Sequence, residues 1–168
     1  METIKKLTFN KVDGTVIENV EQYVKDWTKV NPYGKIILGC DSQVHGRRIK
    51  YTVAVVMHYI DKMQIGHGAH VIIADAWEKR NAKFPEDEMP SKLWREAEYV
   101  LAAAQMVDGS DEYFRKRITL HLDFSPEEKY KSNIMFASGL GLLTSMGYKA
   151  EGKPFAYVAT HTADAFCR

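Results

Sequence analysis

The stretch IILGCDSQVHG, residues 36–46, sets an apolar run directly before an acid. Aspartate is disfavoured in strands and costly to bury without a partner, so an acid at the tip of a buried strand needs an explanation. Either Asp41 begins a turn, or it is held at the strand end for chemistry. One aspartate cannot decide this, so the elements that follow it along the chain must be placed first.

The segments after this stretch predict two further strands, antiparallel to the first. IKYTVAVVMHYI and MQIGHGAHVIIADAW are rich in β-branched and aromatic residues, and the tight pair Asp61-Lys62 lies between them. The charged, Pro-bearing stretch EKRNAKFPEDEMP predicts a loop. The apolar residues of SKLWREAEYVLAAAQMV recur at helical spacing and predict a helix.

The rest of the chain alternates strands and helices. RITLHLDF predicts a fourth strand ending in Asp123, and Ser125-Pro126-Glu127-Glu128 has the pattern of a helix start, with the helix running to about residue 147. PFAYVAT predicts a fifth strand, and THTADAFCR predicts a last helix with Thr160 or Thr162 as its cap. The order βββαβαβα predicts an α/β fold with a five-stranded mixed sheet flanked by helices.

A leading segment precedes this pattern. Thr15 and Glu18 have capping-box spacing, and the apolar residues after them predict an amphipathic helix over 16–30. No repeat, low-complexity tract or linker divides the chain. We therefore expect a single domain over 1–168, with an N-terminal extension (1–35) that carries an extra helix and a core over 36–168.

Composition narrows the class of protein. The 168 residues are 45% hydrophobic and carry a net charge of +1, which argues against a partner held by overall charge alone. Neither cysteine has a CxxC neighbour, and no apolar run is long enough to span a bilayer. We expect a cytoplasmic protein without a membrane partner; oligomeric state is left open.

Acids cluster on the predicted sheet. In mixed sheets of this kind, sites gather at strand carboxyl ends, where Asp41 and Asp123 both fall. On neighbouring parallel strands their carboxylates would lie about 5 Å apart, which a shared cation makes tolerable. Glu96 and Asp164, on the flanking helices, complete an oxygen-rich site for Mg²⁺ or Mn²⁺. Glu98 competes with Glu96, but Glu96 lies beside the apolar stripe of its helix.

This arrangement resembles the ribonuclease H superfamily. LGCDSQ, HLDFSP and THTADAF are similar to the small bacterial ribonuclease H-related proteins of unknown function, over about residues 36–168. The resemblance implies that Asp41, Glu96, Asp123 and Asp164 are catalytic residues that hold two divalent ions for phosphodiester hydrolysis. The family has a histidine well ahead of its final acid, whereas His161 is three residues before Asp164. His161 and Glu98 are therefore auxiliary candidates only.

Other residues offer alternatives. His67 and His70 are three apart in a predicted strand and point to opposite faces, which argues against a shared zinc ion. Cys40 alternates with the core residues opposite Asp41, which favours a packing role. Basic and polar residues beside the acidic site are candidates for nucleic-acid binding: Gln43, His45, Arg47 and Arg48.

The function expected from these features is a metal-dependent nuclease that hydrolyses RNA or RNA-containing duplexes. The alternative is a catalytically inactive ribonuclease H-fold module that binds nucleic acid or protein. An ATP-using relative of the actin and sugar-kinase superfamily is a third class, but it needs two domains and Gly-rich phosphate loops, neither of which is visible in the sequence.

Overall fold

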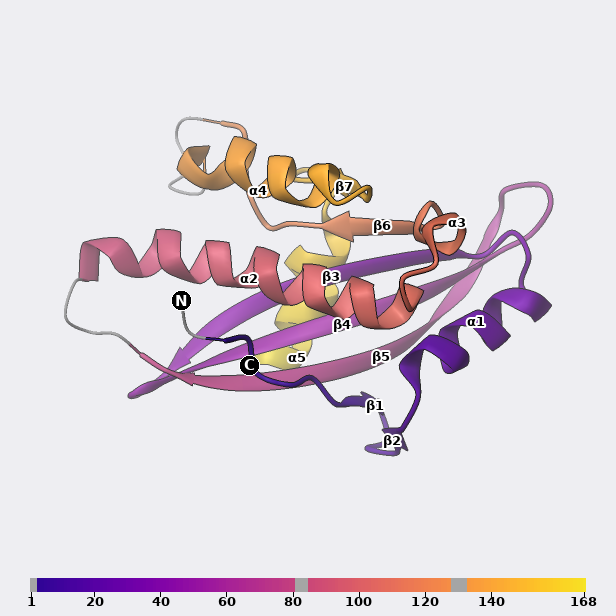
Figure 1. The fold of residues 1–168 in the computed structure, drawn as a ribbon, viewed down its shortest axis with the longest axis horizontal. Coiled ribbons are helices and arrows are strands. Elements are labelled where there is room, and N and C mark those ends of the chain that lie inside the picture. Colours follow the sequence, from indigo (N-terminus) through magenta and orange to yellow (C-terminus); the bar gives the residue numbers. More distant parts are fainter. Residues whose placement is uncertain (1–2, 81–84, 128–132) are drawn as a thin grey trace.

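The computed structural model describes residues 3–80, 85–127 and 133–168, and it is built on one mixed sheet (Figure 1). The seven strands follow the order β2-β1-β5-β4-β3-β6-β7. Their bounds are β1 Phe9–Lys11, β2 Val16–Ile17, β3 Lys35–His45, β4 Arg48–Ile60, β5 Gly66–Lys79, β6 Ile118–His121 and β7 Lys149–Glu151. The helices are α1 Val20–Val30, α2 Pro85–Asp108, α3 Glu112–Arg115, α4 Asn133–Ser145, the π-helix η1 Val158–Ala163 and α5 Asp164–Cys167.

The predicted run of three antiparallel strands is confirmed. β3 pairs with β4, and β4 pairs with β5, both antiparallel over most of their length. The connection from β4 to β5 is longer than the predicted pair: Asp61 accepts hydrogen bonds from the backbone N–H groups of Met63 and Ile65 and holds a turn over residues 61–65. An Asp side chain that binds the backbone ahead of it is a common way to stabilise such a turn.

Helices cover both faces of the sheet. Alternate residues of β3 point to opposite faces: Ile36, Leu38 and Cys40 are buried in the core that includes α2, and Ile37 packs with Val158 of η1. Figure 1 shows α2 and α4 in front of the sheet and α5 behind β3 and β4. The predicted packing role of Cys40 therefore holds, because its side chain is fully buried.

The close contact between η1 and β3 depends on Gly39. A side chain at this position would place its Cβ atom 2.5 Å from the backbone nitrogen of Ala159. Only glycine lets the two backbones approach this closely. Gly39 therefore determines how near the C-terminal helical segment lies to the strand that carries Asp41.

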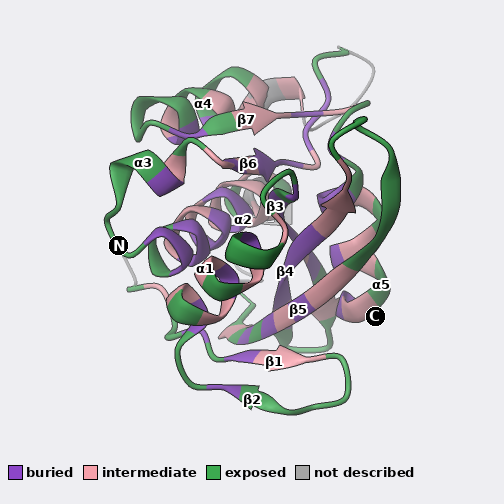
Figure 2. Cartoon of the chain, turned by 90° about the vertical axis from the view of Figure 1, so that its right-hand side faces the viewer, coloured by how far each residue is buried: buried purple, intermediate pink, exposed green. Residues whose placement is uncertain are grey.

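The prediction of five strands is wrong, because the N-terminal segment adds two more. β1 pairs antiparallel with β5 and with β2, on the edge of the sheet away from β6 and β7 (Figure 2). The predicted helix over 16–30 therefore begins later, at Val20. Its N-cap is Asn19, which accepts a hydrogen bond from the backbone N–H of Gln22 at 2.9 Å, instead of Thr15.

The prediction of a strand over PFAYVAT is also wrong. The fifth strand of the core is β7, which pairs parallel with β6, and a helical segment covers residues 157–167 instead. Val158, Ala159 and Ala163 are buried against the sheet, while Tyr157 is 43% exposed. Buried residues with this spacing lie on one face of a helix. Thr160 and Thr162 lie inside the segment and do not cap it.

Two helix starts differ from the pattern read in the sequence. α2 begins at Pro85, so the second half of the predicted loop is helical and Pro90 lies within the helix. Proline at a first helical position is favourable, which fits Pro85. Residues 81–84, and Glu128 of the predicted capping box, lie outside the described residues. The helix predicted to start at Ser125-Pro126 is α4, which begins at Asn133; Ser125 Oγ does accept a hydrogen bond from the backbone N–H of Glu127 at 3.2 Å.

The described helices were also compared with what a bilayer requires. None of those in the described part of the chain combines the length and the apolar character needed to cross a membrane.

Candidate active site

Asp41 and Asp123 lie at the same level of two neighbouring parallel strands. β3 continues to His45, so Asp41 lies within its strand and not at the end, contrary to the prediction. The parallel ladder between β3 and β6, however, ends with the pair Gly39 and His121. Asp41 and Asp123 each follow that last pair by two residues. Asp41 is therefore the point at which β3 loses its neighbour and its side chain becomes accessible.

Glu96 is a buried carboxylate with only one of its oxygens satisfied. It lies on α2, is 3% exposed, and its Oε1 accepts a hydrogen bond from Ser42 Oγ on β3 at 2.5 Å. Oε2 is buried and has no hydrogen-bond partner among the described residues. Burial, together with the negative charges of Asp41 and Asp123, raises the pKa of Glu96 to about 8. The Ser42 hydrogen bond opposes this shift but does not cancel it.

Asp41 is a second acid of this group whose pKa is raised. Burial raises the pKa of Asp41 to about 6, and the charges of Asp123 and Asp164 act in the same direction. The backbone N–H of Ser42 and the charge of Lys92 oppose the shift. The two side chains act on each other in opposite directions, because Asp41 helps to lower the pKa of Asp164 while the charge of Asp164 raises that of Asp41.

The other two acids each have a cationic partner from the chain. Asp123 Oδ1 accepts a hydrogen bond from Thr160 Oγ1 at 2.7 Å and forms an ion pair with Lys153 Nζ at 2.9 Å. Asp164 pairs with Arg168 one helical turn later, at 2.5 Å, and this contact lowers the pKa of Asp164. The helical segment 157–167 thus supplies both Thr160 and Asp164 to the edge where Asp41 lies.

The four acids interact, but they do not form a closed metal site. Among the described residues, no three His, Cys, Asp or Glu side chains lie close enough together to hold a metal ion. Ser42, the partner of Glu96, and Asp41 are adjacent in β3 and point to opposite faces of the sheet. The donor set nevertheless fits a hard divalent cation, because it consists of carboxylate oxygens with one buried oxygen unpaired and two raised pKa values.

Glu98 lies in a separate ion-pair network. Its Oε2 accepts a hydrogen bond from Arg95 at 2.9 Å, and Arg95 also binds Glu78 of β5 at 2.8 Å. The hydroxyl of Tyr99 donates to the same Glu78. Between the two helical candidates, the structure brings Glu96 to the other acids and leaves Glu98 with Arg95.

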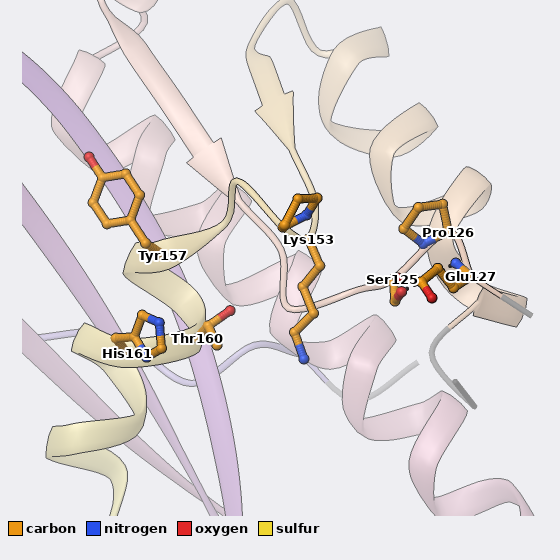
Figure 3. A pocket seen from close by; sticks show the side chains of 8 residues that line it. Ser125, Pro126, Glu127, Lys153, Tyr157, Thr160 and His161 are labelled. Carbon is orange, nitrogen blue, oxygen red and sulfur yellow. Dashed lines mark hydrogen bonds between the residues drawn. The ribbon is translucent and has the colours of Figure 1, made fainter. Parts of the chain in front are cut away.

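His161 lines a pocket together with Lys153 and Thr160 (Figure 3), which are the two partners of Asp123. The pocket has a volume of about 310 Å³, and Lys153 extends between the helix that carries Thr160 and His161 and the segment 125–127. His161 is exposed, and its charge helps to lower the pKa of Asp164. Sequence reasoning missed Lys153 and Thr160 as partners of Asp123, since nothing in the local pattern marks either residue.

His121 fixes the start of the C-terminal helical segment. It is 1% exposed, and its Nδ1 accepts a hydrogen bond from the backbone N–H of Val158 at 3.2 Å. Because Nδ1 accepts this hydrogen bond, the proton of the neutral ring lies on Nε2, 3.4 Å from Glu151, and burial lowers the pKa of His121. His121 thereby positions the segment that brings Thr160 and Asp164 to the site.

The candidate nucleic-acid residues lie farther along the β3–β4 hairpin. Gln43, His45, Arg47 and Arg48 are all exposed. Gln43 and His45 share a face of β3 with Asp41, since alternate residues point the same way. His45 Nε2 lies 3.4 Å from the carbonyl oxygen of Cys167, at the end of α5. The structure therefore places these candidates next to the acids but not among them.

Known proteins were compared with this chain. A family model described as ribonuclease H-like matches residues 15–168. Comparison with curated proteins and with solved structures gave no match. The matched region includes all the acids described above and every strand of the sheet except β1. The chain therefore belongs to the ribonuclease H-like family.

Proposed function

We propose that this protein is a divalent-metal-dependent nuclease that hydrolyses phosphodiester bonds in RNA or RNA-containing duplexes. Membership of the ribonuclease H-like family supports a nuclease-type fold. The convergence of Asp41, Glu96, Asp123 and Asp164 at one edge of the sheet supports the chemistry. The substrate class follows from the family resemblance and from the exposed basic residues on the neighbouring hairpin.

The observation that carries the proposal is the unpaired Oε2 of Glu96. A buried carboxylate without a partner is expensive, and it escapes the cost by taking up a proton or by binding a cation. The raised pKa values of Glu96 and Asp41 describe the first outcome. A divalent cation would provide the second, and carboxylate oxygens suit both Mg²⁺ and Mn²⁺.

Each residue has a role in this proposal. Asp41, Glu96, Asp123 and Asp164 would hold two divalent ions, which when bound activate a water molecule and stabilise the leaving oxygen. Thr160 orients Asp123 through its hydrogen bond to Oδ1. Ser42 orients Glu96 in the same way. Lys153 and Arg168 neutralise Asp123 and Asp164 in the metal-free protein and must move aside, or share their carboxylates, when ions bind.

The same ion pairs favour a second candidate function. Lys153 and Arg168 already neutralise two of the acids, and no three donors in the described residues lie at metal-binding distance. A ribonuclease H-fold module that binds nucleic acid without turnover would retain such ion pairs. Metal-dependent cleavage separates this alternative from the nuclease.

The test is cleavage of end-labelled RNA, DNA and RNA/DNA hybrid by the purified protein, with Mg²⁺, Mn²⁺ or a chelator. Asp123→Asn is the matched variant, because it keeps the shape of the side chain and its bond to Thr160 but removes the charge. The nuclease proposal expects metal-dependent cleavage that this variant loses. Equal cleavage by both proteins, or none by either with any ion, would contradict it and favour the binding module.

A further inference from the structure

The face of the sheet that carries Asp41 continues outward as a regular array of side chains. Residues that pair across antiparallel strands point to the same face, so each register row of β3, β4 and β5 presents three neighbours. The first row is Asp41, Thr52 and Asp75; the second is Gln43, Lys50 and Trp77; the third is His45, Arg48 and Lys79. The acids of the first row thus give way to cations and one aromatic ring.

Trp77 is the central feature of this array. It is 37% exposed and lies where β5 has β4 as its neighbour on one side only, because β1 pairs with β5 no farther along than Ile73. The guanidinium carbon of Arg48 lies 4.6 Å from the centre of the indole, and the His45 ring centre lies 5.3 Å from it. Arg48 and His45 hold the indole in place and leave part of its surface to the solvent.

The charge around Trp77 is positive and largely uncompensated. In the parts of the chain that the structure describes, no carboxylate pairs with Arg47, Arg48 or Lys79. Lys50 differs, because its amine binds the carbonyl of Phe166 at 2.6 Å and lies 3.4 Å from Asp75. Lys50 therefore anchors the end of α5 beside the indole, while the other three cations remain available to phosphate groups.

We propose that Trp77 and Arg48 form a stacking platform for a single-stranded nucleic acid, which enters the site across the outer end of β3–β5. Bases stack on aromatic rings and guanidinium planes only where they are unpaired, and the neighbouring cations suit the backbone that links them. By strand geometry Trp77 lies about 12 Å from Asp41, two residues along and two strands across. This proposal rests on the proposed function for the class of ligand.

The test is direct binding in a chelator, so that it does not depend on cleavage. Labelled rU12 and dT12 are titrated with wild type, Trp77→Ala, Trp77→Phe and Arg48→Ala by fluorescence anisotropy over a salt series. Tyr113→Ala is the matched control, because Tyr113 is an 82% exposed aromatic on α3, away from this array. Melting temperatures of all variants show whether each one is folded.

The platform predicts a graded result. Trp77→Ala should weaken binding by about 5- to 100-fold, and Trp77→Phe should stay within about threefold of wild type. Arg48→Ala should weaken binding and reduce its salt dependence, and Tyr113→Ala should change nothing. Blunt duplex of the same length should bind less tightly than the single strand.

Three results would overturn the platform. The first is an equal loss of oligonucleotide affinity in Trp77→Ala and Tyr113→Ala, and the second is tighter binding of blunt duplex than of single strand. The third is no binding of any oligonucleotide, which would point to a protein partner. The outcome is separate from that of the nuclease proposal. Tryptophan-dependent binding without metal-dependent cleavage would leave the platform standing and reject only the nuclease. If the protein shows metal-dependent cleavage and Trp77→Ala changes neither cleavage nor binding, the nuclease proposal stands and the platform is rejected.

Discussion

Glu96 and Glu98 lie two residues apart on the same helix and have opposite surroundings. Glu98 shares Arg95 with Glu78, so its charge is balanced within the protein. Glu96 is buried near Asp41, the hydroxyl of Ser42 is its hydrogen-bond partner among the described residues, and burial raises its pKa to about 8. A carboxylate that forms an ion pair within the protein has a structural role, whereas a buried carboxylate without such a partner is available to bind a cation.

The strongest test of this contrast is the pair of variants Glu96→Gln and Glu98→Gln. If Glu96 holds a metal ion, its variant should lose at least about 100-fold of the metal-dependent cleavage, because the ligand charge is gone. Glu98→Gln should stay within about threefold, because only its pairing with Arg95 changes. Initial rates at saturating Mn²⁺ measure both, and comparable losses in the two variants would end the distinction.

The second test uses the pH dependence of stability without metal. Because the folded-state pKa of Glu96 lies above its unfolded value of 4.5, folding takes up a proton. The stability that this proton uptake contributes is fully present below pH 4.5, and it is lost as the pH rises through the folded-state pKa of about 8. At pH 8, Glu96→Gln should therefore be more stable than wild type by roughly 2 to 4 kcal/mol in a chelator.

Urea unfolding at pH 5 and pH 8 measures this difference. Glu98→Gln is again the control, and it should be no more stable than wild type at either pH, because it weakens the contact with Arg95. Addition of Mn²⁺ should stabilise wild type at pH 8 more than Glu96→Gln. A Glu96→Gln protein that is less stable than wild type at pH 8 would show that the buried carboxylate is satisfied.

A third test concerns the segment that completes the surroundings of Glu96 and Asp41. Replacing His121 with Leu leaves the buried N–H of Val158 without its acceptor, and should destabilise the protein by about 1 to 3 kcal/mol. Cleavage should fall as well, because Thr160 and Asp164 lie on that segment. His67→Leu, at an exposed histidine that pairs with Asp61, should cost less than about 1 kcal/mol. Equal losses in the two variants would remove the positioning role of His121.

The smallest expected effect concerns the cation that now pairs with Asp123. Lys153→Met should tighten Mn²⁺ binding by about two- to fivefold, because a partly exposed ion pair no longer competes with the metal. Isothermal titration calorimetry measures the affinity, and Lys149→Met, which removes an exposed lysine bound to Glu151, is the control. Weaker binding in Lys153→Met would mean that Lys153 supports the metal site instead of competing with it.

Some errors in the fold prediction share one cause. PFAYVAT is a short apolar run and reads as a strand, but Val158, Ala159 and Ala163 pack against the sheet, where Gly39 allows a close approach, and form a helix. The predicted end of β3 at Asp41 was wrong because the hairpin with β4 extends past the end of β6. In each case the deciding contact comes from a distant segment, which a local pattern does not contain.

For the candidate site too, the local sequence predicts some features, and contacts from distant segments decide the others. The residue types and their elements were readable: two acids after apolar runs, one on an amphipathic helix and one near the C-terminal end. The side-chain contacts of the site could not be predicted from the sequence. Lys153 reaches Asp123 through a turn after β7, and Arg48 meets Trp77 through the register of β4 with β5. Nothing near these residues in the sequence identifies the contact.

Local pattern was sufficient for the family and the three antiparallel strands, and it proposed the four acids, because periodicity and residue chemistry are properties of the chain itself. Long-range packing determined the rest. Among the described residues it left one oxygen of Glu96 without a partner and gave Glu98 an ion pair with Arg95, although the two residues differ only in which side of α2 they occupy. The reason is physical: the pKa and the binding capacity of a carboxylate depend on burial and on neighbouring charge, and both exist only after the chain has folded.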